Sequence, residues 1–362
     1  MKHGFLSKKI KIMLRIIATF FIVVNCLQSF SINTSEKLVS PNKEIEIIIE
    51  IQNGNPVYSI WFNQSQIIRT SSLGFELESP FSEGFELSSM ERGKANRVLK
   101  PLYGEYSKLY DKFNSLTIDL KEIGKLHRLL NIEFRAYNEG FAFRYVFPGK
   151  ENTTSCVIKR ELTEFRFADM AEGFPIYEGE ATFSKVAVPL KEIKPGAHYP
   201  LTVNTGFGYA SILEAFVVNY PRLMFGKTKD GNLVTAIMGE AKINIPFSTP
   251  WRVVILGKDE GKLIENENFV QNLNPVCSLK DVSWIKPGKT ISNEGTFPLK
   301  TVELKKLIDF AAENGFKYLQ LDWGWYGTEV KWTAEQIESF RKYMPKKMVN
   351  TGWEKHTKDN PF

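Results

Sequence analysis

The stretch Asp281–Gly327 reads DVSWIKPGKTISNEGTFPLKTVELKKLIDFAAENGFKYLQLDWGWYG, and its pattern indicates a single βαβ unit. Between Lys300 and Asn314 the apolar residues recur at helical spacing and fall on one face, and Gly315 stands where a C-cap glycine belongs. Phe316–Leu321 is then a short apolar β run. The stretch therefore predicts a helix leading into a strand.

The predicted strand ends in an acid followed by two indoles, at Asp322, Trp323 and Trp325. An acid at the C-terminal end of a parallel strand is where (β/α)8 barrels place groups that handle substrate. Indole rings stack on the C–H faces of pyranoses, so these three residues are candidate sugar contacts. An equally open interpretation is structural: the three residues would lie at the rim of the barrel and be held there by packing.

The preceding part of the chain, residues 35–255, has the texture of strands. Glu44–Gln52 alternates in polarity, Asn53–Pro56 predicts a turn, and Val57–Phe62 continues as a second strand of a hairpin. Further strands are predicted at Ser72–Leu77, Leu116–Leu120, Leu129–Tyr137 and Phe141–Phe147. This pattern predicts a mainly β domain, a large antiparallel sandwich of two packed sheets. Lys258–Leu273 is polar and helical or irregular, and the β texture ends near residue 275, where we expect the domain boundary.

The charge is concentrated at the start of the chain. Of the net charge of +6, residues 1–31 contribute +5, so the remaining body is nearly neutral, which argues against a nucleic-acid-binding surface. The apolar run Ile16–Val24 is too short to span a membrane, and small residues before position 32 suit cleavage. Residues 1–31 therefore read as a signal peptide, and we expect export to the periplasm or cell surface with no membrane span after cleavage. Cys26 leaves a lipoprotein anchor open, although its flanks match a lipobox poorly.

Beyond Cys26, only Cys156 and Cys277 remain, and their wide separation is more typical of buried small residues than of a bridge. The four histidines are scattered, so the sequence does not favour a zinc site.

Glu214 lies between apolar residues in a segment that reads as a strand. In one interpretation it is an edge-strand or outward-facing carboxylate. In the other it is aimed across the domain boundary, where its oxygens would suit a hard cation such as Ca²⁺.

Several stretches, in their order and spacing over roughly residues 36–327, resemble glycoside hydrolase family 97, whose members are exported bacterial α-glycosidases. SWIKPGK at Ser283–Lys289, followed by IDFAAENG and DWGWYG, carries most of the resemblance. The other matching stretches are SSLGFEL at Ser71–Leu77, IEFRAYNEGFAFRY at Ile132–Tyr145, ILEAFVVNYPRLMF at Ile212–Phe225 and TPWRVV at Thr249–Val254.

The resemblance implies a galactose-mutarotase-like β-supersandwich over residues 32–275, then the first units of a (β/α)8 barrel over residues 276–362. It implies that Glu214 is a Ca²⁺ ligand at the active site and that Trp284, at the end of the first barrel strand, is a sugar contact. Asp322, Trp323 and Trp325 would occupy the rim after the second strand. The implied partner is an oligosaccharide or another α-glycoside, and we expect a monomer.

The chemistry of the family requires paired carboxylates, which lie on later barrel strands. Only 87 residues follow residue 275, whereas a whole barrel needs about 250. The sequence therefore predicts an N-terminal fragment with an incomplete barrel, no catalytic carboxylate of its own and weak Ca²⁺ binding. A non-catalytic carbohydrate-binding or scaffold module is the alternative. Another sandwich-plus-barrel glycosidase family is a third possibility, against which Ser283–Lys289 argues. The choice between α-glucosides and α-galactosides, and between retention and inversion, stays open.

Overall fold

A computed structural model of the chain describes residues 34–124, 126–149, 154–177, 186–292 and 301–321, together with Glu335. The predicted signal peptide, residues 1–31, lies outside these residues. The chain divides into two compact units, residues 1–278 and 279–362.

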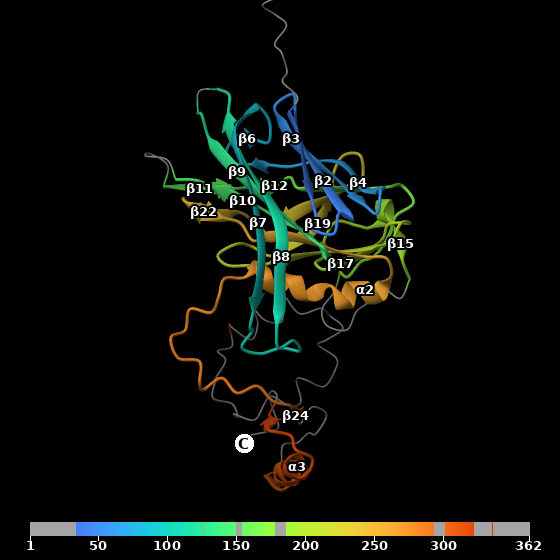
Figure 1. The fold of residues 1–362 in the computed structure, drawn as a ribbon, viewed down its shortest axis with the longest axis vertical. Helices are drawn as coiled ribbons and strands as arrows, with labels where there is room; N and C mark the ends of the chain where they lie inside the picture. Colours follow the sequence, from blue (N-terminus) through green and yellow to red (C-terminus); the bar gives the residue numbers. More distant parts are fainter. Residues whose placement is uncertain are drawn as a thin grey trace, which may run out of the picture. The chain divides into compact units, whose positions relative to one another are not determined.

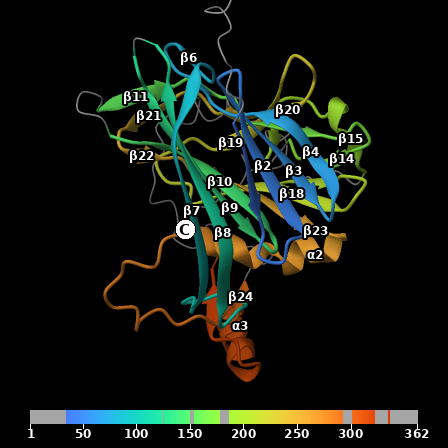
Figure 2. The same cartoon turned by 45° about the horizontal axis from the view of Figure 1, so that its top comes forward.

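The first unit contains two large antiparallel sheets (Figures 1 and 2). The eight-stranded sheet has the order β1 (Thr34–Val39), β2 (Ile45–Gln52), β3 (Asn55–Phe62), β4 (Ser65–Ser72), β13 (Glu164–Phe167), β20 (Leu233–Ile237), β19 (Leu223–Lys227) and β16 (Ala197–His198). The ten-stranded sheet has the order β15 (Val188–Pro189), β14 (Glu172–Phe174), β17 (Leu201–Asn204), β18 (Tyr209–Ala215), β23 (Trp251–Gly257), β10 (Gly140–Phe147), β9 (Leu129–Tyr137), β8 (Leu109–Glu122) and β7 (Phe85–Leu99), and β22 (Phe247–Ser248) pairs with β10.

Smaller elements complete this unit. The short strands are β5 (Phe75–Glu76), β6 (Pro80–Phe81), β11 (Ser155–Ile158), β12 (Arg160–Glu161) and β21 (Ala241–Asn244), and the short helical segments are η1 (Leu190–Glu192), α2 (Glu260–Glu265) and η2 (Glu267–Leu273). The predicted sandwich of two packed sheets is confirmed.

The main hydrophobic core lies between the two sheets. Alternating residues of β2 and of β9 face it, which is why both strands show apolar residues at every second position. A second, smaller core lies on the other face of the ten-stranded sheet, where Leu263 of α2 and Phe269 and Leu273 of η2 belong to one cluster with Trp251, Val253 and Ile255 of β23. Since β23 is covered on both faces, it is buried along its whole length, and its sequence is apolar except for Arg252.

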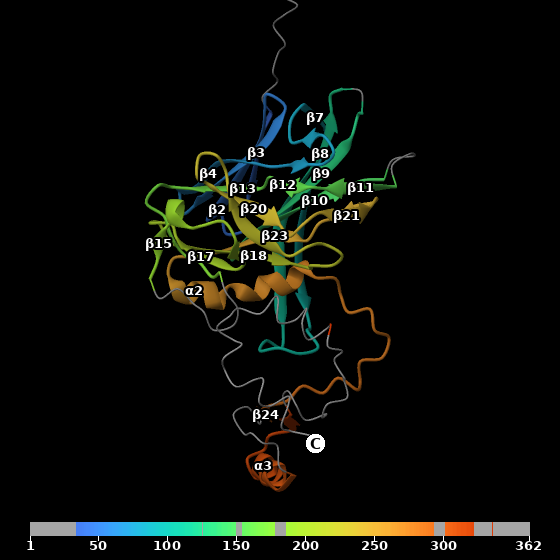
Figure 3. The same ribbon diagram turned by 180° about the vertical axis from the view of Figure 1, so that it is seen from behind.

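The hairpin of β7 and β8 projects from one edge of the ten-stranded sheet (Figures 1 and 3). Most of β7 is exposed, and its charged side chains, such as Glu91 and Arg92, protect this edge strand from pairing with other chains. Arg92 also donates hydrogen bonds to the Lys37 carbonyl oxygen at 2.9 Å and to Glu36 at 2.6 Å.

The strand predicted at Ser72–Leu77 is wrong as one element. β4 ends at Ser72, and only Phe75–Glu76 forms a strand, β5, after it. Gly74 separates the two because it adopts a φ of +130°, and a Cβ there would approach the Cα of Ser82 to 2.7 Å. The chain therefore turns at a position that only glycine tolerates.

Both cysteines of the described residues are free, as expected. Cys156 is half-buried, but Cys277 is exposed, so its predicted burial is wrong.

The second unit contains β24 (Thr290–Ser292), α3 (Thr301–Glu313) and β25 (Tyr318–Gln320). β24 and β25 pair in parallel, with Ile291 opposite Leu319, and Gly315 ends α3 with a φ of +68°. The predicted βαβ unit is confirmed.

Candidate functional site

Glu214 lies in β18, an interior strand between β17 and β23. The register places it directly opposite Arg252 of β23, so both side chains leave the same face of the sheet. Arg252 is fully buried. The interpretation of Glu214 as an edge-strand or outward-facing carboxylate is therefore wrong.

The Glu214 carboxylate is only partly satisfied. Its Oε2 atom is buried, and no described residue donates a hydrogen bond to it. Burial raises the pKa of Glu214, while Arg252 and a hydrogen bond from the backbone N–H of Leu223 counteract this rise. A buried carboxylate oxygen without a partner is unfavourable in a folded protein, and an ion or a water is the usual explanation.

The chain after Glu214 adopts an unusual backbone. Phe216 has a φ of +54° and Asn219 a φ of +52°, both in the left-handed region, which a bulky residue such as Phe rarely adopts. Such strain clusters at functional sites. Val217 and Val218, between them, are exposed, and the chain becomes buried again at Tyr220.

A fully buried ion pair, Glu161–Arg252, lies beside Glu214. The Arg252 Nε donates to Glu161 Oε1 at 2.7 Å, Nη2 donates to Oε2, and Nη1 donates to the Pro250 carbonyl oxygen at 2.8 Å. Glu161 also accepts from Thr163 Oγ1 at 2.8 Å and from the Tyr220 hydroxyl at 3.0 Å. Burial by itself would lower the pKa of Arg252, but Glu161 more than offsets this and raises it.

Several polar residues from outside β18 and its two neighbouring strands lie near Glu214. Arg222, next to Leu223, lies with Nη2 3.5 Å from Nε2 of His198. The Tyr199 ring stacks on Phe225 with centroids 4.1 Å apart, and its hydroxyl lies 3.2 Å from Thr235 Oγ1. Burial raises the pKa of Tyr199, and Glu214 adds to this rise. The site thus combines an acid, basic groups and a buried ion pair.

The other residues predicted for the site belong to the second unit, residues 279–362, and not to the unit that contains Glu214. Trp284 belongs to the second unit and lies in a turn closed by the Ile285 N–H and the Val282 carbonyl oxygen, 3.1 Å apart. This turn precedes β24, so the expectation that Trp284 ends the first strand is wrong. Its indole is 68 % exposed, as a sugar contact requires. Asp322, Trp323 and Trp325 lie outside the described residues.

Sequence reasoning did not predict the polar residues around Glu214. Glu161 and Arg252 are 91 positions apart, and Tyr220 is 59 positions from Glu161. The available signal was Arg252, a single charge inside the apolar run of β23, because a buried charge requires a partner.

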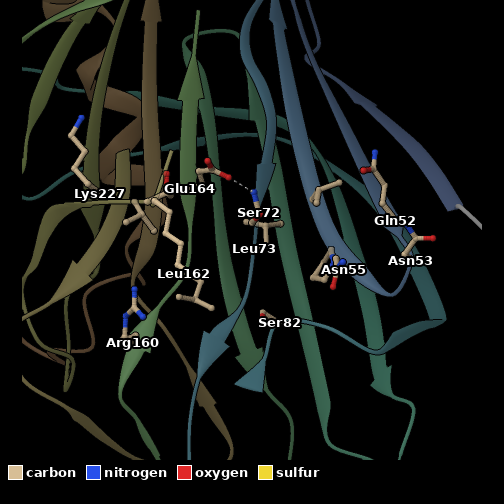
Figure 4. A pocket seen from close by; sticks show the side chains of 15 residues that line it. Gln52, Asn53, Asn55, Ser72, Leu73, Ser82, Arg160, Leu162, Glu164 and Lys227 are labelled. Atoms are coloured by element: carbon tan, nitrogen blue, oxygen red, sulfur yellow. Dashed lines mark hydrogen bonds between the residues drawn. The ribbon is translucent and has the colours of Figure 1, made fainter. Parts of the chain in front are cut away.

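A pocket of about 460 Å³ opens elsewhere on the sandwich (Figure 4). Glu164 lies in it and accepts hydrogen bonds from the Ser72 N–H at 3.2 Å and from the Asn232 side chain at 2.8 Å. Lys227, another lining residue, is the last residue of β19, whereas Leu223, which contacts Glu214, is the first. This pocket is therefore separate from the surroundings of Glu214. None of the predicted site residues lines it.

Glu214 fits the expected calcium site as one contributor. Its unpartnered carboxylate oxygen is the kind of ligand that Ca²⁺ takes, but the ion requires six to eight oxygens. Within the described ranges, no three His, Cys, Asp or Glu side chains come together as a metal site. A calcium ion would therefore need further ligands besides Glu214. No helix in the described part of the chain has the length and apolar character needed to cross a membrane.

A protein-family model and solved enzyme structures of the same family match this chain. The family model described as Glycosyl-hydrolase 97 N-terminal matches residues 38–275. A retaining alpha-galactosidase of Bacteroides thetaiotaomicron is 24% identical over 360 residues, covering 85% of this chain and 53% of the relative. A glycoside hydrolase family 97 enzyme from Pseudoalteromonas sp. strain K8, solved in complex with acarbose, has a TM-score of 0.72 and 28% identity, covering 81% of this chain and 48% of its own.

A beta-arabinopyranosidase structure, with 20% identity and a TM-score of 0.71, shares the fold; the match covers 85% of this chain and 53% of that one. The chain thus spans about half the length of the relatives that it matches.

Proposed function

Because the chain belongs to glycoside hydrolase family 97, we propose that the protein is an exported α-glycosidase that hydrolyses α-galactosides or α-glucosides with the help of Ca²⁺. The observation that carries this proposal is the carboxylate of Glu214. It stands on an interior strand, and one of its oxygens is buried with no partner among the residues that the structure describes; a strained loop follows it. A carboxylate in this state lowers the stability of the fold, and its oxygen is suited to bind a cation.

The relatives support the proposed substrate class. One of them is named a retaining alpha-galactosidase, and another was solved with acarbose. Both names are consistent with a pocket for an α-linked hexose. Trp284, Asp322, Trp323 and Trp325 are the proposed sugar contacts, since exposed indoles stack on sugar rings and a carboxylate accepts hydrogen bonds from hydroxyl groups.

In this proposal, the residues that bind the cation differ from those that carry out hydrolysis. Glu214 would hold the calcium ion together with ligands from the barrel, and a bound Ca²⁺ supplies electrostatic polarisation and orientation at the site. Hydrolysis itself needs two carboxylates, about 5–5.5 Å apart for retention or about 6.5–9.5 Å apart for inversion. We expect this pair on barrel strands that follow the first two. By itself, the 362-residue chain would then bind cation weakly and turn over no substrate.

The test is hydrolysis of 4-nitrophenyl α-galactoside and 4-nitrophenyl α-glucoside, with added Ca²⁺ and with a chelator. The 362-residue chain is compared with the same chain extended by any in-frame coding sequence that follows it. We expect chelator-sensitive turnover from a chain with a complete barrel and none from the 362 residues. A complete barrel that hydrolyses neither substrate would refute the proposal and favour the carbohydrate-binding module.

Turnover by the 362 residues alone would instead place the catalytic pair within them. Glu178, Glu180 and Asp322, which lie outside the described residues, would then be the first acids to replace.

A further inference from the structure

The arrangement around Arg252 raises a question of charge pairing. Arg252 stands directly across the sheet from Glu214, a position from which an arginine and a glutamate normally pair. Yet Oε2 of Glu214 has no partner among the described residues. The guanidinium nitrogens of Arg252 are directed instead to Glu161 and to the Pro250 carbonyl oxygen.

We propose that Glu161 is a positioning residue, which holds Arg252 away from Glu214 and so keeps a Glu214 oxygen available to a cation. This inference rests on the proposed calcium-dependent function. Glu161 touches neither substrate nor metal in this scheme. It acts by engaging two donors of Arg252 in a bidentate pair, which fixes the direction of the planar guanidinium group.

The geometry explains why Glu161 wins the competition for Arg252. Both members of the pair are completely buried, and Glu161 receives further hydrogen bonds from Thr163 and Tyr220, so its position is fixed from several sides. Glu214 is only half-buried and receives a backbone N–H from Leu223. Arg252 therefore lies near two acids: Glu161, whose position is fixed and which is fully desolvated, and Glu214, which is more solvated.

The same carboxylate also fixes the loop after Glu214. The Tyr220 hydroxyl donates to Glu161 Oε2, and Tyr220 ends the strained stretch that contains Phe216 and Asn219. One buried acid thus determines both where Arg252 points and where the chain returns from Glu214.

Loss of the Glu161 charge would leave Arg252 as a buried cation without a partner, which is strongly unfavourable. The carboxylate directly opposite it is that of Glu214, with Cβ atoms of such cross-strand pairs about 4.5–5.5 Å apart. Arg252 would turn to Glu214, fill its free oxygen and cancel its charge. Cation binding would fall although every cation ligand remained in place.

The test measures Tb³⁺ luminescence, with Ca²⁺ competition, on the full chain and on four variants. We expect Glu161→Gln to weaken cation binding by about tenfold or more, the usual effect of losing a residue that supports a metal ligand. The double variant Glu161→Leu with Arg252→Met removes both charges and should restore binding close to that of the parent chain. Glu214→Gln should abolish it, and Glu164→Gln, which removes a carboxylate from the neighbouring strand β13, should leave it unchanged.

The double variant tests whether the unpaired charge of Arg252, and not the absence of Glu161 itself, weakens binding. If the double variant loses binding as much as the single variant does, the inference is overturned. The double variant also keeps the test valid if Glu161→Gln does not fold, because replacement of a whole buried ion pair by apolar residues is commonly tolerated.

A crystal structure of Glu161→Gln gives a readout that does not depend on metal. We expect the guanidinium group of Arg252 to contact Glu214 there. If Arg252 keeps its position against residue 161, the inference is refuted. If Arg252 does move in the variant while neither the parent chain nor the chain extended to a complete barrel binds Tb³⁺, the proposed calcium role fails and the positioning role of Glu161 stands.

Discussion

Replacement of Tyr220 by Phe tests the buried network with a single atom. The change removes the hydroxyl that donates to Glu161 Oε2 at 3.0 Å and keeps the ring, which stacks on Phe247 with centroids 6.2 Å apart. A hydrogen bond to a charged, buried acceptor contributes about 1.5–3 kcal/mol to stability. With about 2 kcal/mol lost, the melting temperature of a domain of this size should fall by roughly 4–8 °C.

The matched control is Tyr199→Phe. Tyr199 is a half-buried tyrosine that also stacks on a phenylalanine, but its hydroxyl contacts the neutral Thr235 hydroxyl at 3.2 Å. Loss of a neutral hydrogen bond should cost about 1 kcal/mol, half of the effect expected for Tyr220. Urea unfolding of both variants, read as a shift in midpoint at an unchanged slope, compares the two free energies directly.

Hydrogen exchange adds a local readout. Since Tyr220 ties the loop of residues 216–222 to Glu161, the amides of this loop should exchange faster in Tyr220→Phe than in Tyr199→Phe. A Tyr220→Phe variant that is as stable as Tyr199→Phe, with unchanged loop exchange, would refute the reasoning that Glu161 anchors this loop.

Three further predictions concern pH, backbone and packing. Burial raises the pKa of Glu214 in the folded chain, so the folded state loses stability as the pH rises from the unfolded pKa through the folded one. Glu214→Gln should therefore gain stability relative to the parent chain over this pH range. A stability difference in urea unfolding that does not change with pH would contradict this. Gly74→Ala should lower the free energy of unfolding by more than the roughly 1–3 kcal/mol of backbone strain alone, because its Cβ would also meet Ser82. Gly104→Ala, with φ +109° and no atom within 4 Å of its Cβ, should lose only the strain energy. Equal melting temperatures for the two variants would contradict this. Trp251→Ala should destabilise the chain by about 3–5 kcal/mol in the same assay, because this buried indole also lies 4.5 Å beneath the guanidinium groups of both Arg135 and Arg144; a loss below about 1 kcal/mol would exclude it as a core residue.

The parts of the fold that sequence predicted are those governed by local period. The β2–β3 hairpin follows from alternating polarity around Asn53-Gly54, and α3 follows from its apolar stripe and Gly315. The two sheets could be anticipated as a class, but their strand order could not. β4 pairs with β13 about a hundred residues away, and no local pattern records such a partner.

Of the candidate site, the sequence pointed only to Glu214. The residues around it were missed for a physical reason. Glu161 lies in the charged stretch KRELTEF, which a local reading assigns to solvent, and it occupies a strand of only two residues. Its burial depends on Arg252, which arrives from β23, and on Tyr220, which arrives from a loop. A buried ion pair between distant segments is a property of the assembled sheet, so single-sequence reasoning could find only one half of it.

The surroundings of Glu214 depart from the local rules that the rest of the sandwich obeys. A carboxylate oxygen is buried without a described partner, a phenylalanine adopts a left-handed backbone, and a complete ion pair is withdrawn from water. Each of these features is unfavourable or neutral for stability, and each would be removed by substitutions that the fold could accommodate. Their coincidence at one end of β18 is therefore hard to explain by folding alone. It supports the proposal that this end of the strand is functional, on physical grounds that are independent of the family resemblance, because natural chains break such rules mainly at functional sites.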